Sequence, residues 1–231
     1  LLGKIRRQSL SFVSLQFLCY TTDRMSELNI LEQVLGIPFN NRSLLEQALT
    51  HRSILNENPD LTLPSNERLE FLGDAVLNFT VTQALYQEFP ELPEGELTKI
   101  RTSLICRETL ARLALSLKLG DYLYLGKGEE ISGGRNKPSN LANTLEAIIG
   151  AVFLDQGLAS ATEFVLKLLN SELQKIKKYG ITPNYKTMLQ EYTQAEYKQT
   201  PLYHLVEATG PDHNKSFTVE VALGDRILGR G

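Results

Sequence analysis

The chain has 231 residues, enough for one large domain or for a medium domain followed by a small one. It is 42% hydrophobic and 22% charged, as in an ordinary globular protein, and its net charge of −3 is not that of a strongly basic nucleic-acid-binding protein. The two cysteines, Cys19 and Cys106, lack metal-site spacing, which argues against a zinc site or a disulfide framework and fits a reducing compartment.

Residues 1–24 precede the first methionine, Met25, and open with a basic run at 4–7 followed by an apolar stretch at 9–20. Polar side chains interrupt the apolar stretch, and no small-residue cleavage site follows it. The stretch is also too short and too polar to cross a membrane. We therefore expect the protein to start at Met25 and residues 1–24 to be a disordered upstream extension, with a targeting peptide as the alternative.

Helical periodicity dominates as far as Tyr179 and predicts helices over 28–35, 43–51, 66–89, 97–105, 107–118, 141–154 and 159–178. Asn66 is the expected N-cap of the long third helix. A loop is predicted over 56–65, and a glycine-rich loop over 126–137. Because no strand is predicted here, residues 25–179 should form an all-α domain.

The composition changes at 180–184, which predicts a linker before a second domain over 185–231. A short helix is expected over 185–196. Two β-like runs at 202–208 and 216–223 follow it, separated by a turn cluster at 210–214, and a third strand is expected to begin near Arg226.

Residues 67–77 read ERLEFLGDAVL and place three carboxylates, Glu67, Glu70 and Asp74, at steps of three and four. On a helix this spacing puts all three on one narrow face. That face lies beside an apolar stripe formed by Leu69, Leu72, Val76 and Phe79. Clustered carboxylates repel one another and lose hydration, so a positive partner is needed, and a hard divalent cation fits oxygen ligands.

A second polar pair, Asn143 and Glu146, stands three residues apart in the run NTLEAIIG at 143–150 and shares a helical face. Asn143 alone would be an ordinary polar residue of a helix surface. Its spacing to Glu146 marks the pair as a second polar cluster on a helix.

The run ERLEFLGDAVL resembles the hallmark sequence of the ribonuclease III family, and the resemblance extends from about Leu31 to the end of the chain. The runs KTMLQE at 186–191 and GPDH at 210–213 resemble a double-stranded-RNA-binding domain. The resemblance implies an all-α endonuclease domain followed by a small α+β domain of the α-β-β-β-α type. That domain is expected to be incomplete, because the family's lysine-rich second helix does not follow Gly231 in this sequence.

The resemblance also implies the roles of the site residues. Glu70, Asn143, Glu146 and Asp74 would hold Mg²⁺, for which Mn²⁺ can substitute, and Asp74 and Glu146 would be catalytic. Glu67 and Glu94 match further acidic positions near the cleavage site, although both can instead be first-turn acids that complement a helix dipole. The family usually has Asp where this chain has Asn143, so weaker metal binding is expected.

Phe71 would be a core residue by its type, but the resemblance implies that it inserts into the partner subunit of a symmetric homodimer. His51 is expected to be structural rather than a general base. The loop 126–137 lacks the strand-to-helix context of a P-loop, so no nucleotide cofactor is expected, and its Lys127, Arg135 and Lys137 could contact the RNA backbone. RNA contacts in the second domain are expected from Gln190, Glu191, Pro211 and His213.

The implied activity is Mg²⁺-dependent cleavage of double-stranded RNA that leaves 5′-phosphates, 3′-hydroxyls and short 3′ overhangs. The implied substrates are rRNA precursors and other structured transcripts, including mRNAs. We expect a cytoplasmic protein of the bacterial type without a membrane partner. The alternative is a non-catalytic double-stranded-RNA-binding protein on the same fold, because Asn143 replaces an acidic residue.

Overall fold

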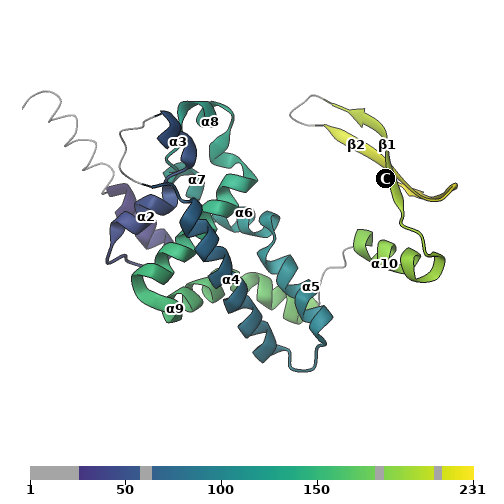
Figure 1. Cartoon of the computed structure of the whole chain (residues 1–231), viewed down its shortest axis with the longest axis horizontal. Coiled ribbons are helices and arrows are strands. Elements are labelled where there is room, and N and C mark those ends of the chain that lie inside the picture. Colours follow the sequence, from purple (N-terminus) through teal and green to yellow (C-terminus); the bar gives the residue numbers. More distant parts are fainter. Residues whose placement is uncertain (1–25, 58–63, 180–184, 211–214) are drawn as a thin grey trace, which may run out of the picture. The chain divides into compact units, whose positions relative to one another are not determined.

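The computed structural model describes residues 26–57, 64–179, 185–210 and 215–231. The chain divides into two compact units, Leu1–Lys178 and Tyr179–Gly231, and each is considered by itself (Figure 1). Four segments named in the sequence predictions lie wholly or mostly outside the described residues: the extension 1–24, residues 58–63 of the predicted loop 56–65, the linker 180–184, and the predicted turn with Pro211 and His213.

The first unit is a bundle of helices, which confirms the predicted all-α class (Figure 1). Residues 26–35 form its first helix. The other elements are α2 (Arg42–Leu49), α3 (Arg52–Glu57), α4 (Glu67–Glu88), α5 (Glu94–Ile105), α6 (Arg107–Ser116), α7 (Leu119–Tyr122), α8 (Lys127–Ile131), the 3₁₀ turn η1 (Gly134–Asn136) and α9 (Pro138–Tyr179).

Four short elements, α3, α7, α8 and η1, have only three to six residues each and were not predicted. Elements of one turn or so are too short to show a hydrophobic period. The prediction of a loop over 126–137 is therefore wrong, because this segment contains α8 and η1. Helix α5 also begins at Glu94, before the predicted start at Leu97.

Asn66 does not cap α4 as predicted. Its backbone is already helical, with φ −73° and ψ −12°, and its side chain makes no capping hydrogen bond. A capping residue needs an extended backbone so that its side chain can turn back onto the helix. Asn66 is instead buried, and its Nδ2 donates to the Ala48 carbonyl at 3.4 Å while its backbone N–H donates to the Thr50 carbonyl at 2.9 Å. These bonds tie the start of α4 to the end of α2.

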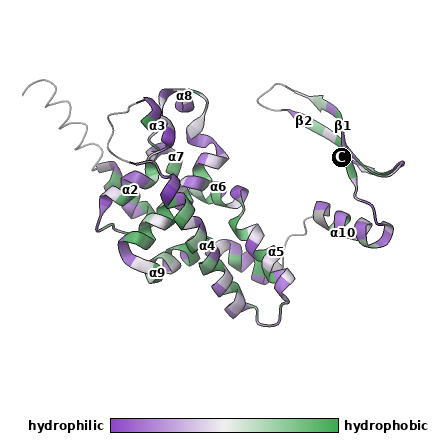
Figure 2. Cartoon of the chain, in the orientation of Figure 1, coloured by the Kyte–Doolittle hydropathy of each residue, from purple (hydrophilic) through white to green (hydrophobic). Residues whose placement is uncertain are grey.

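The core of the first unit forms around the first half of α9. Most of its apolar side chains are buried, and Leu145, Ile148, Ile149 and Val152 are completely so. Figure 2 shows this concentration of hydrophobic residues along α9 and α4. The apolar stripe predicted on α4 is confirmed for Leu69 and Val76, which are buried, and is wrong for Phe79, which is 52% exposed. Helix α4 therefore keeps an aromatic residue outside the core.

Helices α4 and α9 cross in contact at two glycines. A Cβ atom on Gly73 would lie 1.8 Å from the Glu146 carbonyl oxygen, and one on Gly150 would lie 2.3 Å from the Leu69 carbonyl oxygen. Neither position can hold a larger residue without moving a backbone. This close approach brings together the acidic faces of two helices that are far apart in the sequence.

The second unit contains α10 (Tyr185–Tyr197) and an antiparallel sheet of β1 (Leu202–Thr209), β2 (Ser216–Leu223) and β3 (Arg226–Arg230) in the order β1-β2-β3. The register pairs Leu205 with Val219 and Val221 with Gly229. Helix α10 contacts the sheet through the Lys186 ammonium, which lies 4.8 Å from the centre of the Tyr203 ring. This order of one helix followed by three strands confirms the predicted α+β class.

Candidate active site

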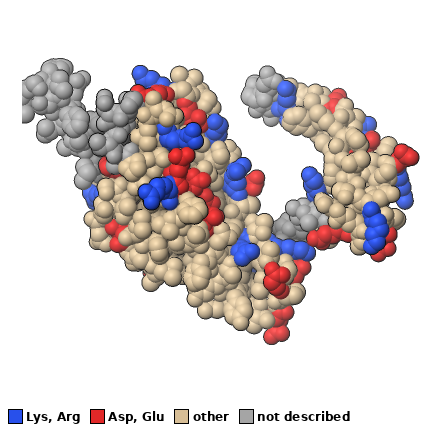
Figure 3. Space-filling view, viewed as in Figure 1, with Lys and Arg blue, Asp and Glu red and all other residues tan. Residues whose placement is uncertain are grey.

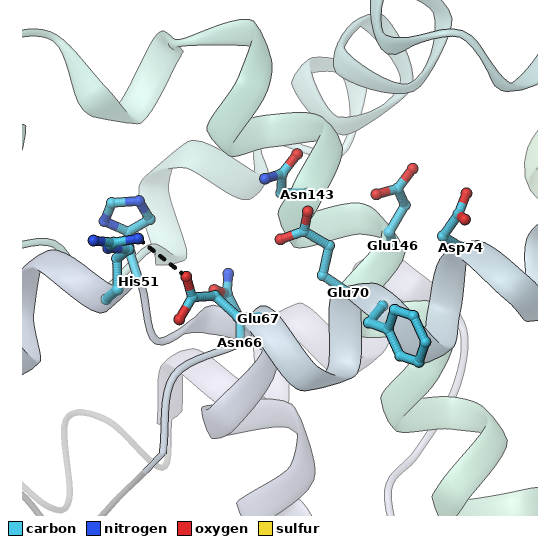
Figure 4. Close-up of a pocket in the computed structure, with 9 residues that line it drawn as sticks. His51, Asn66, Glu67, Glu70, Asp74, Asn143 and Glu146 are labelled. Atoms are coloured by element: carbon cyan, nitrogen blue, oxygen red, sulfur yellow. Dashed lines mark hydrogen bonds and ion pairs between the residues drawn. The ribbon is translucent and has the colours of Figure 1, made fainter.

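A pocket of about 520 Å³ opens where α4 crosses α9 (Figure 4). Helix α4 supplies its acidic face and α9 supplies its polar pair, while the segment before α3 closes one end. The residues that line the pocket are His51, Arg52, Asn66, Glu67, Glu70, Phe71, Asp74, Asn143 and Glu146. In Figure 4, Glu70, Asn143, Glu146 and Asp74 converge on the middle and one end of the pocket, and His51 lies at the opposite end.

Burial and neighbouring carboxylates raise the pKa values of two acids of this pocket, Glu146 and Glu70. Burial raises the pKa of Glu146 to about 7, with further contributions from Asp74 and Glu70 and an opposing effect of Arg107. Burial and the charge of Glu67 also raise the pKa of Glu70, while a hydrogen bond from the Asn143 side chain lowers it. Because the pocket destabilises the negative charges of its own carboxylates, the binding of a cation there is favourable.

Figure 3 shows the acidic side chains gathered along this face of the first unit, with basic side chains at its border. One of those basic residues is Arg52, whose guanidinium lies 3.3 Å from a Glu67 carboxylate oxygen. Both side chains are more than half exposed, so this ion pair adds little stability. Ser65 Oγ also donates to Glu67 at 3.0 Å, which fixes this carboxylate at the rim of the pocket.

The structure therefore brings together five of the six acidic or amide residues that the sequence predicted, namely Glu67, Glu70, Asp74, Asn143 and Glu146. The sixth, Glu94, does not line this pocket. It accepts a hydrogen bond from Thr98 at 2.9 Å and lines a separate cavity between α4 and α5. In the second unit, Gln190 and Glu191 are exposed on α10.

Phe71 is not a core residue, because 82% of its surface is exposed. Two further aromatic residues of α4 are also exposed, Phe79 by 52% and Tyr86 by 74%. Their spacing of eight and seven residues places all three on one face of the helix. An exposed aromatic stripe of this kind on a folded domain marks an interaction surface.

Two of the three basic residues expected to contact the RNA backbone have structural partners instead. Arg135 pairs with Glu130 and donates to the carbonyls of Gly120, Asp121 and Leu123. Lys137 pairs with Glu129 at 2.9 Å. These contacts hold the 126–137 segment together, and contact of its basic residues with the RNA backbone stays a prediction.

Arg52 and Asn66 line the pocket but were not predicted as site residues. Arg52 follows His51 directly in the sequence, and a basic residue in an otherwise acidic pocket is a signal that only the assembled structure makes visible. Asn66 directly precedes the acidic run, and its residue type and position predicted a helix cap. The sequence therefore offers no reason to place Asn66 in the pocket wall.

The carboxylates of α4 and the Asn143 and Glu146 side chains of α9 offer oxygen ligands, which suits a hard cation such as Mg²⁺ or Mn²⁺. Among the described residues, no three His, Cys, Asp or Glu side chains stand close enough to enclose an ion by themselves. Mg²⁺ does not require such a cage, because it keeps several waters and uses one or two carboxylates. The pocket thus fits a metal-dependent phosphodiester hydrolase joined to an α-β-β-β module.

Comparison with known proteins agrees with this class. A Ribonuclease-III-like family model matches residues 41–173, and a Double-stranded RNA binding motif matches residues 185–231. A Ribonuclease 3 of Dehalococcoides mccartyi is 46% identical over 207 residues, which cover 90% of this chain and 87% of that protein. A Ribonuclease 3 of Roseiflexus sp. is 48% identical over 199 residues, which cover 85% of this chain and 84% of that protein.

The nuclease domain of ribonuclease III from Campylobacter jejuni is similar in structure, with 42% sequence identity and a TM-score of 0.57, over 62% of this chain and 96% of that one. The chain belongs to the ribonuclease III family. It is an endoribonuclease specific for double-stranded RNA, with a double-stranded-RNA-binding motif after its nuclease domain and a need for a divalent metal ion.

Proposed function

We propose that the pocket at the crossing of α4 and α9, called the acid pocket below, binds Mg²⁺ through Glu70, Asn143 and Glu146. Asp74 lies beside the ion as a catalytic acid, and Mn²⁺ can replace Mg²⁺. The observation that carries this proposal is the meeting of the α4 and α9 acidic faces in one pocket. Mg²⁺ supplies charge neutralisation at the phosphate and lowers the pKa of a bound water. The products are expected to carry 5′-phosphate and 3′-hydroxyl ends.

The chain's own residues prepare this chemistry. The Asn143 side chain lies beside Glu70 and stabilises the charged form of that carboxylate. Asp74 is exposed at the other end of the pocket, where Asn78 Nδ2 donates to its Oδ1 at 2.8 Å. This bond holds the Asp74 carboxyl in place while its other oxygen remains able to hand a proton to the leaving oxygen of the RNA. Glu67 at the rim is proposed to act beside the entering RNA strand.

Asn143 makes the metal site less negative than a site with Asp at that position. An amide oxygen ligates a hard cation but brings no charge, so we expect weaker metal binding that still permits cleavage. Asn143→Asp should bind the cation at least several-fold more tightly, and Glu146→Ala should bind it more weakly.

The test uses an end-labelled RNA duplex with Mg²⁺ for cleavage, and calorimetric titration with Ca²⁺ for metal binding without turnover. We expect staggered cuts by the parent protein, at least 100-fold slower cleavage by Glu146→Ala, and tighter Ca²⁺ binding by Asn143→Asp. Cleavage by Asn143→Asp alone would mean that the native residue has disabled the site, which is the non-catalytic alternative. Cleavage by Glu146→Ala at the parent rate would refute the proposed site.

We further propose that the protein is a homodimer in which the aromatic stripe of α4, defined as Phe71, Phe79 and Tyr86, packs against a second copy of itself. In a two-fold dimer the same surface meets on both subunits. If two α4 helices pair antiparallel around Phe79, Phe71 of one subunit meets the region around Tyr86 of the other. A cavity of about 400 Å³ lies at that place, lined by Thr82, Leu85, Tyr86, Leu92, Glu94, Leu97, Thr98 and Arg101.

This pairing also accounts for Glu94. Phe71 lines the acid pocket of its own subunit, and Glu94 lines the cavity proposed to receive Phe71 of the partner subunit. In the dimer, Glu94 therefore approaches the acid pocket of the partner and serves the cleavage site there. Two such pockets facing one duplex would cut each strand once and leave short 3′ overhangs.

Phe71→Ala should shift the protein from dimer to monomer and reduce cleavage strongly, because an exposed aromatic anchor and the cavity that it fills would both be lost. Sedimentation velocity measures the change. The matched control is Ile131→Ala, which truncates an 88% exposed apolar residue of α8 away from the stripe and should remain dimeric. A Phe71→Ala protein that stays dimeric at micromolar concentration would refute this interface.

For substrate, we propose that the second unit holds the duplex through Gln190 and Glu191 of α10 and through the Pro211–His213 turn, by contacts to 2′-hydroxyls in the minor groove. Exposure of Gln190 and Glu191 on α10 is consistent with this role. Precursors of rRNA and structured mRNAs are the proposed cellular substrates, and the cytoplasm is the proposed location.

A further inference from the structure

His51 lies at the end of the acid pocket away from Asp74, in the turn between α2 and α3 (Figure 4). Its backbone is anchored: the His51 N–H donates to the Tyr124 carbonyl at 3.1 Å, next to the parallel bridge between Thr50 and Tyr124. The imidazole is therefore held by its backbone as well as by its ring contacts, and its orientation toward the pocket is a built feature of the fold.

The hydrogen bonds around Ser53 decide which ring nitrogen carries the proton. The Gly126 N–H donates to Ser53 Oγ at 2.9 Å, so the hydroxyl hydrogen of Ser53 is available for another acceptor. His51 Nδ1 lies 2.8 Å from Ser53 Oγ, and the Ser53 backbone N–H also points at Nδ1 from 3.3 Å. A backbone N–H can only donate, so Nδ1 must be the acceptor and Nε2 must carry the hydrogen.

This segment is held rigidly from both sides. The Glu57 carboxylate of α3 accepts the backbone N–H groups of Lys127 at 2.8 Å and Gly128 at 3.2 Å, at the start of α8. A Cβ atom on Gly126 would lie 2.5 Å from Glu57 Oε1 and 2.7 Å from the Ser53 carbonyl oxygen, so only glycine allows this approach. The docking of α3 on α8 thus keeps Ser53 in place under the imidazole.

The environment also keeps the ring neutral. Burial lowers the pKa of His51 from its ordinary value, and the positive charges of Arg52 and Lys137 lower it further, while Glu129 and Glu67 oppose them. A second proton on Nδ1 would also face the Ser53 backbone N–H, donor against donor. His51 therefore has no free lone pair to offer to the pocket, which excludes it as a general base in this arrangement.

The Nε2–H group is a hydrogen-bond donor that still lacks a partner within the part of the chain that the structure describes. Both hydrogen bonds of the ring among the described residues go to Nδ1, and no buried polar side-chain atom of those residues is left unpaired. Nε2 is therefore reachable from the pocket that His51 lines. The pocket that this donor faces is acidic and would repel the phosphate of an RNA strand. Hydrogen-bond donors to the phosphate oxygens are needed to offset that repulsion, and Nε2–H can be one of them.

We propose that His51 is a substrate-binding residue whose Nε2–H donates a hydrogen bond to a non-bridging phosphate oxygen of the RNA strand, with Ser53 as the positioning residue that sets the tautomer. This inference rests on the proposed function of the acid pocket. It assigns the His51 end of the pocket to the RNA backbone and the Glu146 end to the metal ion.

The test compares His51→Gln and His51→Ala with the parent in single-turnover cleavage, and in duplex binding with Ca²⁺ in place of Mg²⁺. Glutamine can place an N–H donor near the position of Nε2, whereas alanine cannot. We expect His51→Ala to lower kcat/KM by about 10- to 100-fold, because one hydrogen bond to a charged group is lost. The kcat/KM of His51→Gln should stay within about fivefold of the parent value. A glutamine variant as impaired as the alanine variant would reduce His51 to a structural role and overturn the proposal.

A substrate change locates the bond itself. Replacing non-bridging phosphate oxygens near the cleavage site by sulfur weakens a hydrogen bond at one of those positions. At that position the defect of His51→Ala should shrink at least severalfold, because parent and variant then lack the same contact. If the defect is the same at every phosphorothioate, His51 does not contact the phosphate.

The tautomer is measured separately from activity. In protein labelled with ¹⁵N-histidine, long-range ¹H–¹⁵N spectra should show His51 protonated at Nε2 at neutral pH, with the signal assigned by its absence from His51→Gln. Ser53→Ala should keep the Nε2–H tautomer, because the backbone N–H of residue 53 still donates to Nδ1. A protonated Nδ1 in the parent would overturn the proposal. Cleavage by Glu146→Ala at the parent rate would instead refute the proposed function of the pocket, so the two failures are distinguishable.

Discussion

The contact between Gly73 of α4 and Gly150 of α9 should be the most sensitive position for both stability and activity. A Cβ atom at residue 73 would lie 1.8 Å from the Glu146 carbonyl oxygen and 2.9 Å from the Gly150 nitrogen. These are backbone atoms, which cannot turn away as a flexible side chain can. Gly73→Ala therefore forces the two helices apart.

The size of the effect follows from this geometry. Ordinary contact begins near 3.4 Å, so the crossing must open by about 1.6 Å at residue 73 before the new methyl group fits. Overpacking of this kind costs about 1–3 kcal/mol, which lowers Tm by roughly 2–12 °C in a protein of this size. Because Glu70 and Asp74 flank Gly73, and Glu146 supplies the contacted carbonyl, the acid pocket opens too. A misplacement of about 1 Å costs about 100-fold in rate.

The assay measures thermal unfolding and single-turnover cleavage of a labelled duplex for Gly73→Ala and Gly150→Ala. The second variant should be the milder one, since its Cβ atom would lie 2.3 Å from the nearest backbone oxygen. The control is Gly95→Ala in α5, where no atom lies within 4 Å of the added Cβ and the helix should be unchanged or slightly more stable. A folded Gly73→Ala protein with parental Tm and parental cleavage would refute the reasoning.

Two further variants test the electrostatics and the backbone of α9. In metal-free protein, the folded-state pKa of Glu146 is about 7 against 4.5 when unfolded, so its contribution to stability is complete below pH 4.5 and is lost as the pH rises through 7. Glu146→Gln should therefore have a free energy of unfolding about 1–2 kcal/mol higher than the parent at pH 8 in EDTA, after allowing for the partial exposure of residue 146. Urea unfolding that gives both proteins the same pH dependence would exclude this. Gly157 interrupts α9 with φ 82° and ψ −178°, a backbone conformation that favours glycine. Gly157→Ala should therefore lower the free energy of unfolding by about 1–3 kcal/mol, although no atom lies within 4 Å of the added Cβ. Equal urea midpoints for Gly157→Ala and the parent would contradict that reading.

The local features of this protein can be read from its amino-acid order alone. Spacing along the chain predicts which side chains share a helical face, because helix geometry depends only on sequence neighbours. Two such sets are Glu67, Glu70 and Asp74, at steps of three and four, and Asn143 and Glu146, three residues apart. The same local rules predicted the long helices and the change to strands after the linker. They could not assign the shortest helices, which do not contain a full period, or the backbone state of Asn66.

How those helical faces meet is set by the packing of distant segments. Periodicity indicates that a face is buried or polar, but it does not say which distant segment lies against it. The glycine pair at 73 and 150 sets the crossing of α4 and α9, and a glycine in isolation is compatible with a turn, a cap or a close approach. The exposure of Phe71 and the proton arrangement at His51 likewise depend on what other segments cover or contact. Their physical origin is packing between residues that are remote in the chain, which local sequence patterns do not encode.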